Sequence, residues 1–326
     1  MKNILVIGGA GYVGTHLVGM LLEDRHKVTV YDLFIYGNFF SEDKNLSLIK
    51  GDIRNLESLK KIINNNFDCI IHLACISNDP SFDLNPDLGK SINFDPFEKL
   101  VKISKDAGVD RFIYASSSSV YGVKEEKDVD ENFSLQPLTD YSKYKAMCED
   151  ILLKYNDKKF TCCIVRPATV CGYSKRQRLD VVVNILTNLA YHTGKITIFG
   201  GPQLRPNINI NDMSKAYIFL INQKANLVSG EIYNVGFENC SVDTLGDLVV
   251  KNMNSKIIVK HLKTNDNRSY HISSKKIQSN LGFKNSHTIE DAIKDLIIAF
   301  KNDQFDNPLQ NEIYFNIKRM KSMNLK

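Results

Sequence analysis

The stretch Gly8-Gly9-Ala10-Gly11-Tyr12-Val13-Gly14 decides the fold of this chain. It follows a short apolar run over residues 4–7, and a helical pattern begins within it and continues to residue 22. Glycines between a strand and a helix let the backbone turn tightly and approach a pyrophosphate at the helix N-terminus, although glycine-rich turns also occur for packing reasons. The spacing GxxGxxG predicts a dinucleotide-binding turn with contacts from Gly8, Gly11, Tyr12, Val13 and Gly14.

Apolar runs and helical patterns continue to alternate from this turn to about residue 170. Strands are predicted over residues 27–31, 46–50, 68–73, 111–115 and 161–165, and helices over 56–63, 87–107 and 141–155. Strands that are almost continuously apolar and separated by helices indicate a parallel sheet covered on both faces. The predicted fold class is α/β, a Rossmann-type doubly wound parallel sheet that forms a dinucleotide-binding domain over residues 1–170.

The order of elements becomes irregular after residue 170. Short strands are predicted over residues 196–199, 207–210 and 257–260, and helices over 213–221, 242–253, 275–281 and 289–300. We expect residues 171–326 to form mainly a smaller C-terminal α/β lobe that binds the substrate, with some segments returning to the sheet. The basic tail after Asp303 is expected to be solvated.

Composition places the chain among ordinary soluble proteins. Its 326 residues are 43% hydrophobic and 24% charged, and the formal net charge is +5. The basic residues are mostly Lys, with only nine Arg, which is weak evidence for nucleic-acid binding, and we expect no such partner. Seven cysteines without a CxxC pair fit neither a disulfide framework nor a metal site, which favours a reducing cytoplasm. No apolar run approaches the roughly 18 residues of a membrane span, so no membrane partner is expected.

Asp32 predicts which dinucleotide binds. It ends the second strand 18 residues after Gly14, where a carboxylate binds the two ribose hydroxyls of NAD. No Arg or Lys lies between Asp32 and Asp43, so the 2′-phosphate of NADP would meet repulsion without a cationic partner. NAD is therefore the predicted cofactor.

Two further strand ends supply predicted cofactor contacts. Asp52 and Ile53 follow the third strand, where the carboxylate can accept a hydrogen bond from the adenine amino group; alternatively, Asp52 caps the next helix. Leu73 and Ala74 follow His72 at the end of the fourth strand, where small residues let the backbone lie beside the cofactor. We interpret His72 itself as a packed, hydrogen-bonded histidine rather than a catalytic one.

Tyr141 and Lys145 form the candidate catalytic pair. They lie four residues apart on one helical face, where an ammonium group near a phenol lowers its pKa from about 10 and suits it to acid/base chemistry. The YxxxK spacing occurs four times in this Lys-rich chain, and only Tyr141 opens a helix after the polar end of the fifth strand. That end contains Ser117, which we expect to hydrogen-bond a substrate hydroxyl, although a serine run can also be a flexible loop.

These motifs, in this order, resemble the extended short-chain dehydrogenase/reductase family over nearly the whole chain. They are the glycine turn, Asp32, the HLA stretch, SSSSVYG, YSKYK and Arg166-Pro167. Within that family the sequence is similar to the NAD-dependent epimerase/dehydratase group that acts on nucleotide-diphosphate sugars, such as UDP-glucose 4-epimerase. The resemblance implies that Tyr141 is the acid/base, that Lys145 contacts the nicotinamide ribose and that Ser117 contacts the sugar. We also expect a homodimer.

The resemblance further implies a nucleotide-diphosphate sugar as the partner. Arg205 matches an arginine of the family that contacts the nucleotide diphosphate, and Arg268 resembles a later diphosphate contact. Two guanidinium groups suit four phosphate oxygens, although either arginine alone could form a surface salt bridge. The other predicted substrate contacts are Ser118, Thr169 and Asn184, with Thr169 at a position where galactose epimerases usually carry Asn. Lys175, Arg176 and Arg178 either add positive potential at the entrance or form a solvated turn.

Three reactions are compatible with such a site: 4-epimerisation, 4,6-dehydration, and net oxidation or reduction at C4. Dehydratases of the family carry acidic residues just after the serine or threonine, whereas this chain has Ser118 and Ser119. A serine hydroxyl cannot replace a carboxylic acid as a proton donor near neutral pH. Epimerisation at C4 is therefore favoured, followed by a nucleotide-sugar 4-dehydrogenase or reductase and then a 4,6-dehydratase. A dinucleotide-sensing protein without catalysis is the alternative outside the enzymes.

Overall fold

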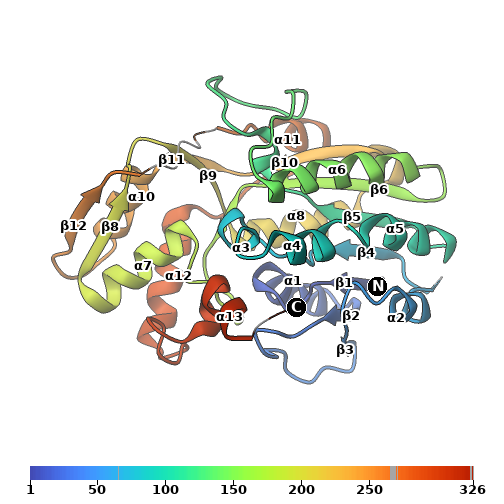
Figure 1. The fold of residues 1–326 in the computed structure, drawn as a ribbon, viewed down its shortest axis with the longest axis horizontal. Coiled ribbons are helices and arrows are strands. Elements are labelled where there is room, and N and C mark those ends of the chain that lie inside the picture. Colours follow the sequence, from blue (N-terminus) through green and yellow to red (C-terminus); the bar gives the residue numbers. More distant parts are fainter. Residues whose placement is uncertain (65, 265–268, 270, 324, 326) are drawn as a thin grey trace.

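The computed structural model describes residues 1–326 except 65, 265–268, 270, 324 and 326. Its centre is a seven-stranded parallel sheet with the strand order β10-β6-β5-β4-β1-β2-β3 (Figure 1). The strands are β1 (Asn3–Ile7), β2 (Lys27–Asp32), β3 (Leu46–Lys50), β4 (Cys69–His72), β5 (Arg111–Ala115), β6 (Thr161–Pro167) and β10 (Glu231–Val235). The predicted Rossmann-type α/β fold is confirmed.

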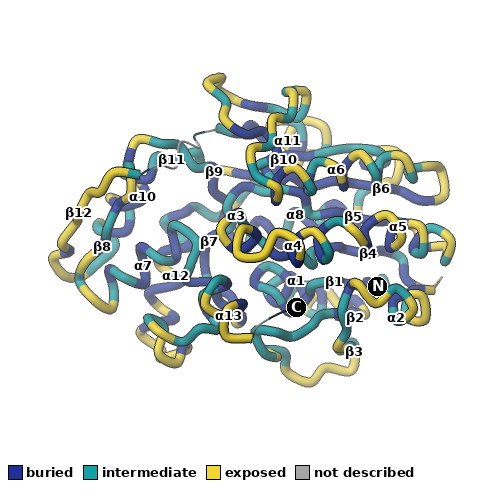
Figure 2. Tube along the Cα trace, viewed as in Figure 1, coloured by how far each residue is buried: buried dark blue, intermediate teal, exposed yellow. Residues whose placement is uncertain are grey.

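Helices cover both faces of this sheet, because alternate residues of each strand point to opposite faces. Ile4 and Val6 of β1 pack into one hydrophobic cluster, whereas Leu5 and Ile7 pack into another. The first face carries α1 (Tyr12–Glu23) and α8 (Ile210–Asn222). The second face carries α2 (Leu56–Ile62), α4 (Pro86–Asn93), α5 (Phe97–Asp106) and α6 (Asp140–Tyr155). Figure 2 shows the buried strands between these exposed helix faces.

The single helix predicted over residues 87–107 is wrong, because the structure has two helices there. Asn85 caps α4 by accepting a hydrogen bond from the Leu88 N–H at 3.0 Å. Pro96 then interrupts the pattern and immediately precedes α5. Proline lacks a backbone N–H, and its ring clashes with the preceding turn, so a helix cannot run through it undisturbed.

A second lobe packs beside the sheet, on the left in Figure 1. It contains a core between α7, α10 and α12 together with two small sheets, β11-β9-β7 and β12-β8. The elements after β6 outside the central sheet are β7 (Thr169–Cys171), α7 (Val182–Thr193), β8 (Lys195–Phe199), β9 (Leu204–Asn209), α9 (Ala225–Val228), β11 (Glu238–Ser241), α10 (Val242–Lys251), β12 (Ile258–Leu262), α11 (Lys275–Leu281), α12 (Ile289–Lys301), η2 (Glu312–Tyr314) and α13 (Asn316–Met323). Two short helices of the first part are α3 (Asp79–Phe82) and η1 (Ser118–Tyr121).

Several segments beyond residue 170 return to the central sheet. Strand β10 pairs in parallel with β6, with Ile232 opposite Ile164, and forms the edge of the sheet. Helix α8 packs on α1 within the cluster that covers one face. The two parts of the molecule are therefore interlaced along the chain. Among the described residues, no helix is both long and apolar enough to cross a membrane.

The C-terminal tail is not the solvated basic end that its charge predicted. Residues Asn316 and Met320 of α13 are buried, and Met320 belongs to the hydrophobic cluster that covers the second face of the sheet. The Arg319 guanidinium donates to the Ile35 carbonyl at 2.5 Å and to Glu312. Local charge predicted solvation, but contacts with distant segments fix this helix in place.

Candidate active site

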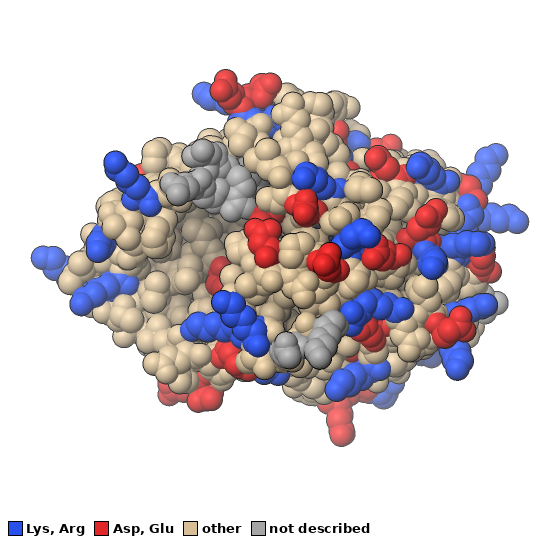
Figure 3. Space-filling view, in the orientation of Figure 1, with Lys and Arg blue, Asp and Glu red and all other residues tan. Residues whose placement is uncertain are grey.

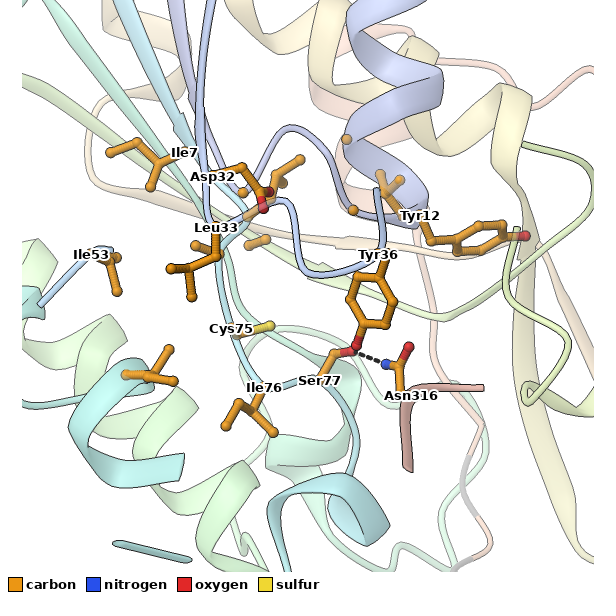
Figure 4. A pocket seen from close by; sticks show the side chains of 18 of the residues that line it. Ile7, Tyr12, Asp32, Leu33, Tyr36, Ile53, Cys75, Ile76, Ser77 and Asn316 are labelled. Atoms are coloured by element: carbon orange, nitrogen blue, oxygen red, sulfur yellow. Dashed lines mark hydrogen bonds between the residues drawn. The ribbon is translucent and has the colours of Figure 1, made fainter. Parts of the chain in front are cut away.

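A pocket opens at the carboxyl ends of β1, β2, β4 and β5, the edge where open α/β sheets bind ligands. Figure 3 shows the surface hollowed between the sheet and the second lobe, and Figure 4 shows the pocket from close by. The predicted residues that line it are Gly8, Gly11, Tyr12, Val13, Gly14, Asp32, Ile53, Leu73, Ala74, Tyr141 and Lys145. The fold therefore brings the predicted cofactor turn and the predicted catalytic pair into one cavity.

The glycine turn closes tightly and leaves room at the start of α1. Gly8 has φ +83°, and a Cβ atom there would lie 2.3 Å from the Ala74 nitrogen. A Cβ at Gly14 would lie 2.6 Å from the carbonyl oxygens of Gly8 and Gly9, so this glycine permits close packing of the helix on the turn. Gly11 lines the pocket, and a Cβ there would meet only the Gly8 oxygen, at 3.4 Å. The helix N-terminus is thus open to a phosphate group.

The Asp32 carboxylate is fixed at the pocket edge by backbone donors. Oδ2 accepts from the Ala10 N–H at 3.0 Å, and Oδ1 accepts from the Phe34 N–H at 2.8 Å. Burial raises the pKa of Asp32, while these hydrogen bonds and the positive charge of Arg176 oppose the increase. Each carboxylate oxygen retains a second acceptor position, so the geometry fits a ribose diol.

Arg176 and Arg178 also line the pocket, which the sequence left undecided. The Arg176 guanidinium stacks on the Tyr36 ring at 3.6 Å from its centroid, and burial lowers the pKa of Arg176 to about 10, so it stays charged near neutral pH. Arg178 donates to Asp180 at 2.8 Å and to Ser77 at 3.3 Å. The Nε atom of Arg176 and an Nη atom of Arg178 are buried without a hydrogen-bond partner among the described residues. Unpaired cationic donors beside a glycine turn fit a pyrophosphate.

Tyr141 and Lys145 are held on α6 by the cap of that helix. Thr139 forms a capping box with Ser142, and its hydroxyl also donates to Asp79. The Lys145 ammonium donates to the Ala115 carbonyl at 2.6 Å and lies 5.8 Å from the centroid of the Tyr141 ring. The end of β5 and the first turns of α6 are therefore tied together at the pocket wall.

The pKa of Tyr141 differs from its prediction. Burial raises it well above its ordinary value, and Cys75 and Asp79 raise it further. The hydrogen bond with the Ser117 side chain and the charge of Arg178 lower it by less. The predicted lowering of this pKa by a neighbouring ammonium is therefore not seen in this structure, because desolvation of the phenol outweighs the nearby positive charge.

The serine run over residues 116–119 places Ser116 in the pocket lining instead of the predicted Ser117 and Ser118. Ser117 is the N-cap of η1 and accepts from the Ser119 N–H at 3.1 Å. Ser118 is buried and is absent from the pocket lining, so its predicted sugar contact has no support in this arrangement. Ser116 lines the pocket instead, and its hydroxyl donates to the buried carboxylate of Glu149. That carboxylate also pairs with Arg166 at 2.6 Å, which joins the ends of β5 and β6 to α6.

Asn184 supports the pocket wall from within rather than facing a ligand. Its side chain is fully buried, its oxygen accepts from the Gly172 N–H at 3.0 Å, and its amide donates to the Tyr12 hydroxyl at 3.1 Å. Its amide also donates to the Arg178 carbonyl at 2.8 Å. The predicted substrate contact from Asn184 is corrected accordingly: with its hydrogen-bonding groups engaged internally, it positions Tyr12 and the arginine-bearing loop.

The remaining predicted contacts lie away from the described pocket lining. Asp52 forms an ion pair with Arg54 at 2.6 Å, and Asn55 rather than Asp52 caps α2, so the capping alternative is wrong. Thr169 lies in β7 opposite Asn207 of β9. Arg205 lies in β9, with Nη1 donating to the Leu204 carbonyl at 3.0 Å. Arg268 lies outside the described residues.

Comparisons with known proteins agree with this geometry. The model of the NAD dependent epimerase/dehydratase family matches residues 4–236. The UDP-glucose 4-epimerase of Lactobacillus helveticus is 27% identical over 253 residues, covering 72% of this chain and 76% of the relative. The dTDP-D-glucose 4,6-dehydratase of Mus musculus is 30% identical over 316 residues, covering 90% and 87%. The structure of UDP-glucuronic acid 4-epimerase from Bacillus cereus, in complex with UDP-glucuronic acid and NAD, has a TM-score of 0.80 at 25% identity and covers 92% of this chain and 99% of that chain.

Proposed function

This chain belongs to the NAD-dependent epimerase/dehydratase family, and from that premise we propose that it epimerises a nucleotide-diphosphate sugar at C4. One observation favours epimerisation over dehydration. Tyr141 and Lys145 line the same pocket as Asp32, and the two positions that follow Ser117, where dehydratases of the family carry acidic residues, are Ser118 and Ser119. Dehydration needs an acid near the reacting carbons, whereas epimerisation needs one proton acceptor and a reversible hydride acceptor.

The residues of the pocket suit NAD, which when bound supplies the hydride acceptor and returns the hydride. The start of α1 at Gly11, with Arg176 and Arg178, would hold the pyrophosphate. Asp32 would accept hydrogen bonds from the adenosine ribose. Lys145 would donate to the nicotinamide ribose while it remains tied to the end of β5.

Tyr141 would exchange a proton with the sugar 4-hydroxyl. Its buried phenol is protonated in the resting chain, so the nearby Lys145 ammonium is needed to stabilise the phenolate when the proton leaves the sugar. Ser117 would hold the same sugar oxygen, since its side chain is close enough to the Tyr141 phenol to lower the pKa of that group. The same two hydroxyl groups can return the proton to the opposite epimer.

The diphosphate side of the substrate is assigned to the second lobe. Arg205 of that lobe would bind the phosphates together with Arg268, whose position is outside the described residues, and Thr169 would make a sugar-diphosphate contact. A pocket that grips the diphosphate more firmly than the sugar allows a 4-keto intermediate to rotate before the hydride returns.

The test is product analysis with UDP-, dTDP-, GDP- and CDP-sugars at a catalytic amount of NAD. Inversion at C4 by NMR with constant total NADH is the expected result. Conversion of all added NAD to NADH, with turnover ending when the NAD is consumed, would instead establish a 4-dehydrogenase. A 4-keto-6-deoxy product would establish a 4,6-dehydratase, the second candidate, which the similarity to the mouse dehydratase supports. A loss of turnover by roughly 10²- to 10⁴-fold in Tyr141→Phe would show that the product arises in this pocket.

A further inference from the structure

The C-terminal helix α13 forms part of the pocket wall. Asn316, at its first position, lines the pocket although it is only 3% exposed, and Leu325 lines the pocket just after the helix. These residues lie some 300 positions after the glycine turn in the chain. The far end of the chain therefore contributes to the same cavity as its beginning.

Asn316 connects three separate segments around this cavity. Its side-chain oxygen accepts from Arg176 at 2.8 Å, and its side-chain amide donates to the Ser77 hydroxyl at 3.1 Å (Figure 4). Its backbone N–H donates to Asp180 at 2.7 Å, and the same carboxylate group pairs with Arg178. A single buried amide thus fixes the arginine-bearing loop against the loop that follows β4.

Two further contacts keep the helix in place. Arg319 donates to the carbonyl of Ile35, next to Tyr36, on whose ring Arg176 stacks. Met320 is buried in the hydrophobic cluster on the second face of the sheet. The loops after β2, β4 and β7 and the helix α13 consequently form a closed ring of contacts around one side of the pocket.

We propose that Asn316 is a positioning residue that fixes Arg176 and Ser77 around the dinucleotide, and that it keeps NAD bound from one turnover to the next. The inference rests on the proposed function for its consequence. In an epimerisation, the NADH formed in the first half of the reaction is oxidised back to NAD in the second half. The cofactor therefore has no need to leave the protein between turnovers. A net dehydrogenase must exchange it every time, and a closed wall at this place would slow that exchange.

The experiment measures release of NADH from the full-length protein without any sugar. The protein is loaded with NADH, and the loss of nicotinamide fluorescence is followed after addition of excess NAD. We expect Asn316→Ala to release NADH at least tenfold faster, about the effect of losing one hydrogen bond to a charged group. Asn316→Asp should release it much more slowly than Asn316→Ala, because it retains an acceptor for Arg176.

Asn188→Ala is the matched control. Asn188 is also buried and donates to the Pro308 carbonyl at 2.9 Å, which joins α7 to the C-terminal region, but it does not line the pocket. It should lose comparable thermal stability and keep the wild-type release rate. Equal release rates in Asn316→Ala and wild type would overturn the proposal, as would equal acceleration in Asn188→Ala.

If Asn316→Ala does not fold, Ser77→Ala gives the same test, because it removes the hydroxyl that Asn316 contacts. Faster release in this variant supports the proposal, and an unchanged rate contradicts it. Since no sugar is present, a failed epimerase assay leaves this result intact. Conversely, unchanged release rates leave the epimerase proposal standing.

Discussion

At the scale of single residues, the proposed proton transfer depends most on Tyr141. Its phenol is buried and its pKa is raised, so the chain on its own favours the protonated form. Catalysis by Tyr141 therefore depends on the arrangement of its cationic and hydroxyl neighbours rather than on an intrinsically acidic phenol.

Tyr141→Phe should retain NAD binding and lose turnover by roughly 10²- to 10⁴-fold, because the ring remains and the transferable proton does not. Cofactor titration and steady-state kinetics measure the two effects. Tyr155→Phe is the matched control, since Tyr155 lies on the same helix with the same YxxxK spacing and its hydroxyl contacts Glu98 at 3.2 Å. Full activity in Tyr141→Phe would remove this residue from the reaction.

His72 leads to a prediction about how the stability of the fold depends on pH. Burial lowers the pKa of His72 from 6.5 to about 3, and the ring stacks on Tyr114. Because the folded pKa lies below the unfolded value, only the unfolded chain gains this proton as the pH falls. Stability should therefore decrease from pH 6.5 towards pH 3, by about 5 kcal/mol in total from this group.

Urea unfolding at several pH values between 4 and 7 measures this dependence. His72→Phe should flatten it by about 1.4 kcal/mol per pH unit, because the replacement fills a similar space and does not titrate. His261→Phe, at an exposed position, serves as the control for replacing a histidine by phenylalanine. An unchanged slope in His72→Phe would mean that another group carries the acid sensitivity.

At the scale of elements, the helix that holds the catalytic pair depends on its first turn. Thr139 and Thr288 each close a capping box, with Ser142 on α6 beside the pocket and with Asp291 on α12 in the second lobe. Thr139→Ala and Thr288→Ala should each cost about 1 kcal/mol of stability in chemical unfolding. Only Thr139→Ala should also lower kcat, and Thr139→Ser should restore it. Equal kcat values in both alanine variants would show that the Thr139 cap does not affect catalysis.

Sequence patterns predicted those elements whose signals are local. β4 is buried along its whole length, so its apolar run identifies it directly. The return of β10 to the sheet edge follows from pairing with β6, some 70 residues earlier, which no local pattern encodes. The break before α5 had a local signal, Pro96, that the apolar periodicity on either side obscured.

The same distinction applies within the site. The glycine turn, Asp32 and Tyr141 carry spacing signals and were predicted to lie near one cavity, where the structure indeed brings them together. Arg176 was undecided because its burial depends on Tyr36 and on Asn316, which lies 140 residues away. Asn184 resembled a ligand contact because an amide on a helix after the catalytic strands suits one, whereas its partners belong to the pocket wall.

At the scale of the whole molecule, the cofactor pocket and the second lobe are expected to bind different ligands, so that substitutions in one should not affect binding to the other. Arg205→Ala should weaken UDP binding about 10-fold or more and leave NAD binding unchanged, because its strand belongs to the second lobe. Calorimetry with each ligand measures both affinities. Lys195→Ala, an exposed cation in the same lobe, serves as the control for general loss of positive charge. Unchanged UDP affinity in Arg205→Ala would place this arginine outside the substrate site.

The contact between Arg319 and Ile35 spans 284 residues, and this has a consequence for how the protein folds. Closing so long a loop costs more chain entropy than forming neighbouring strand and helix pairs, so the ring around the pocket should assemble late. In refolding from denaturant, circular dichroism should recover before NADH fluorescence reports a bound cofactor. A population with native secondary structure and no affinity for the dinucleotide would then exist for a measurable time. An excess of NAD would lower the equilibrium population of this open form, because NAD binds and stabilises the closed form.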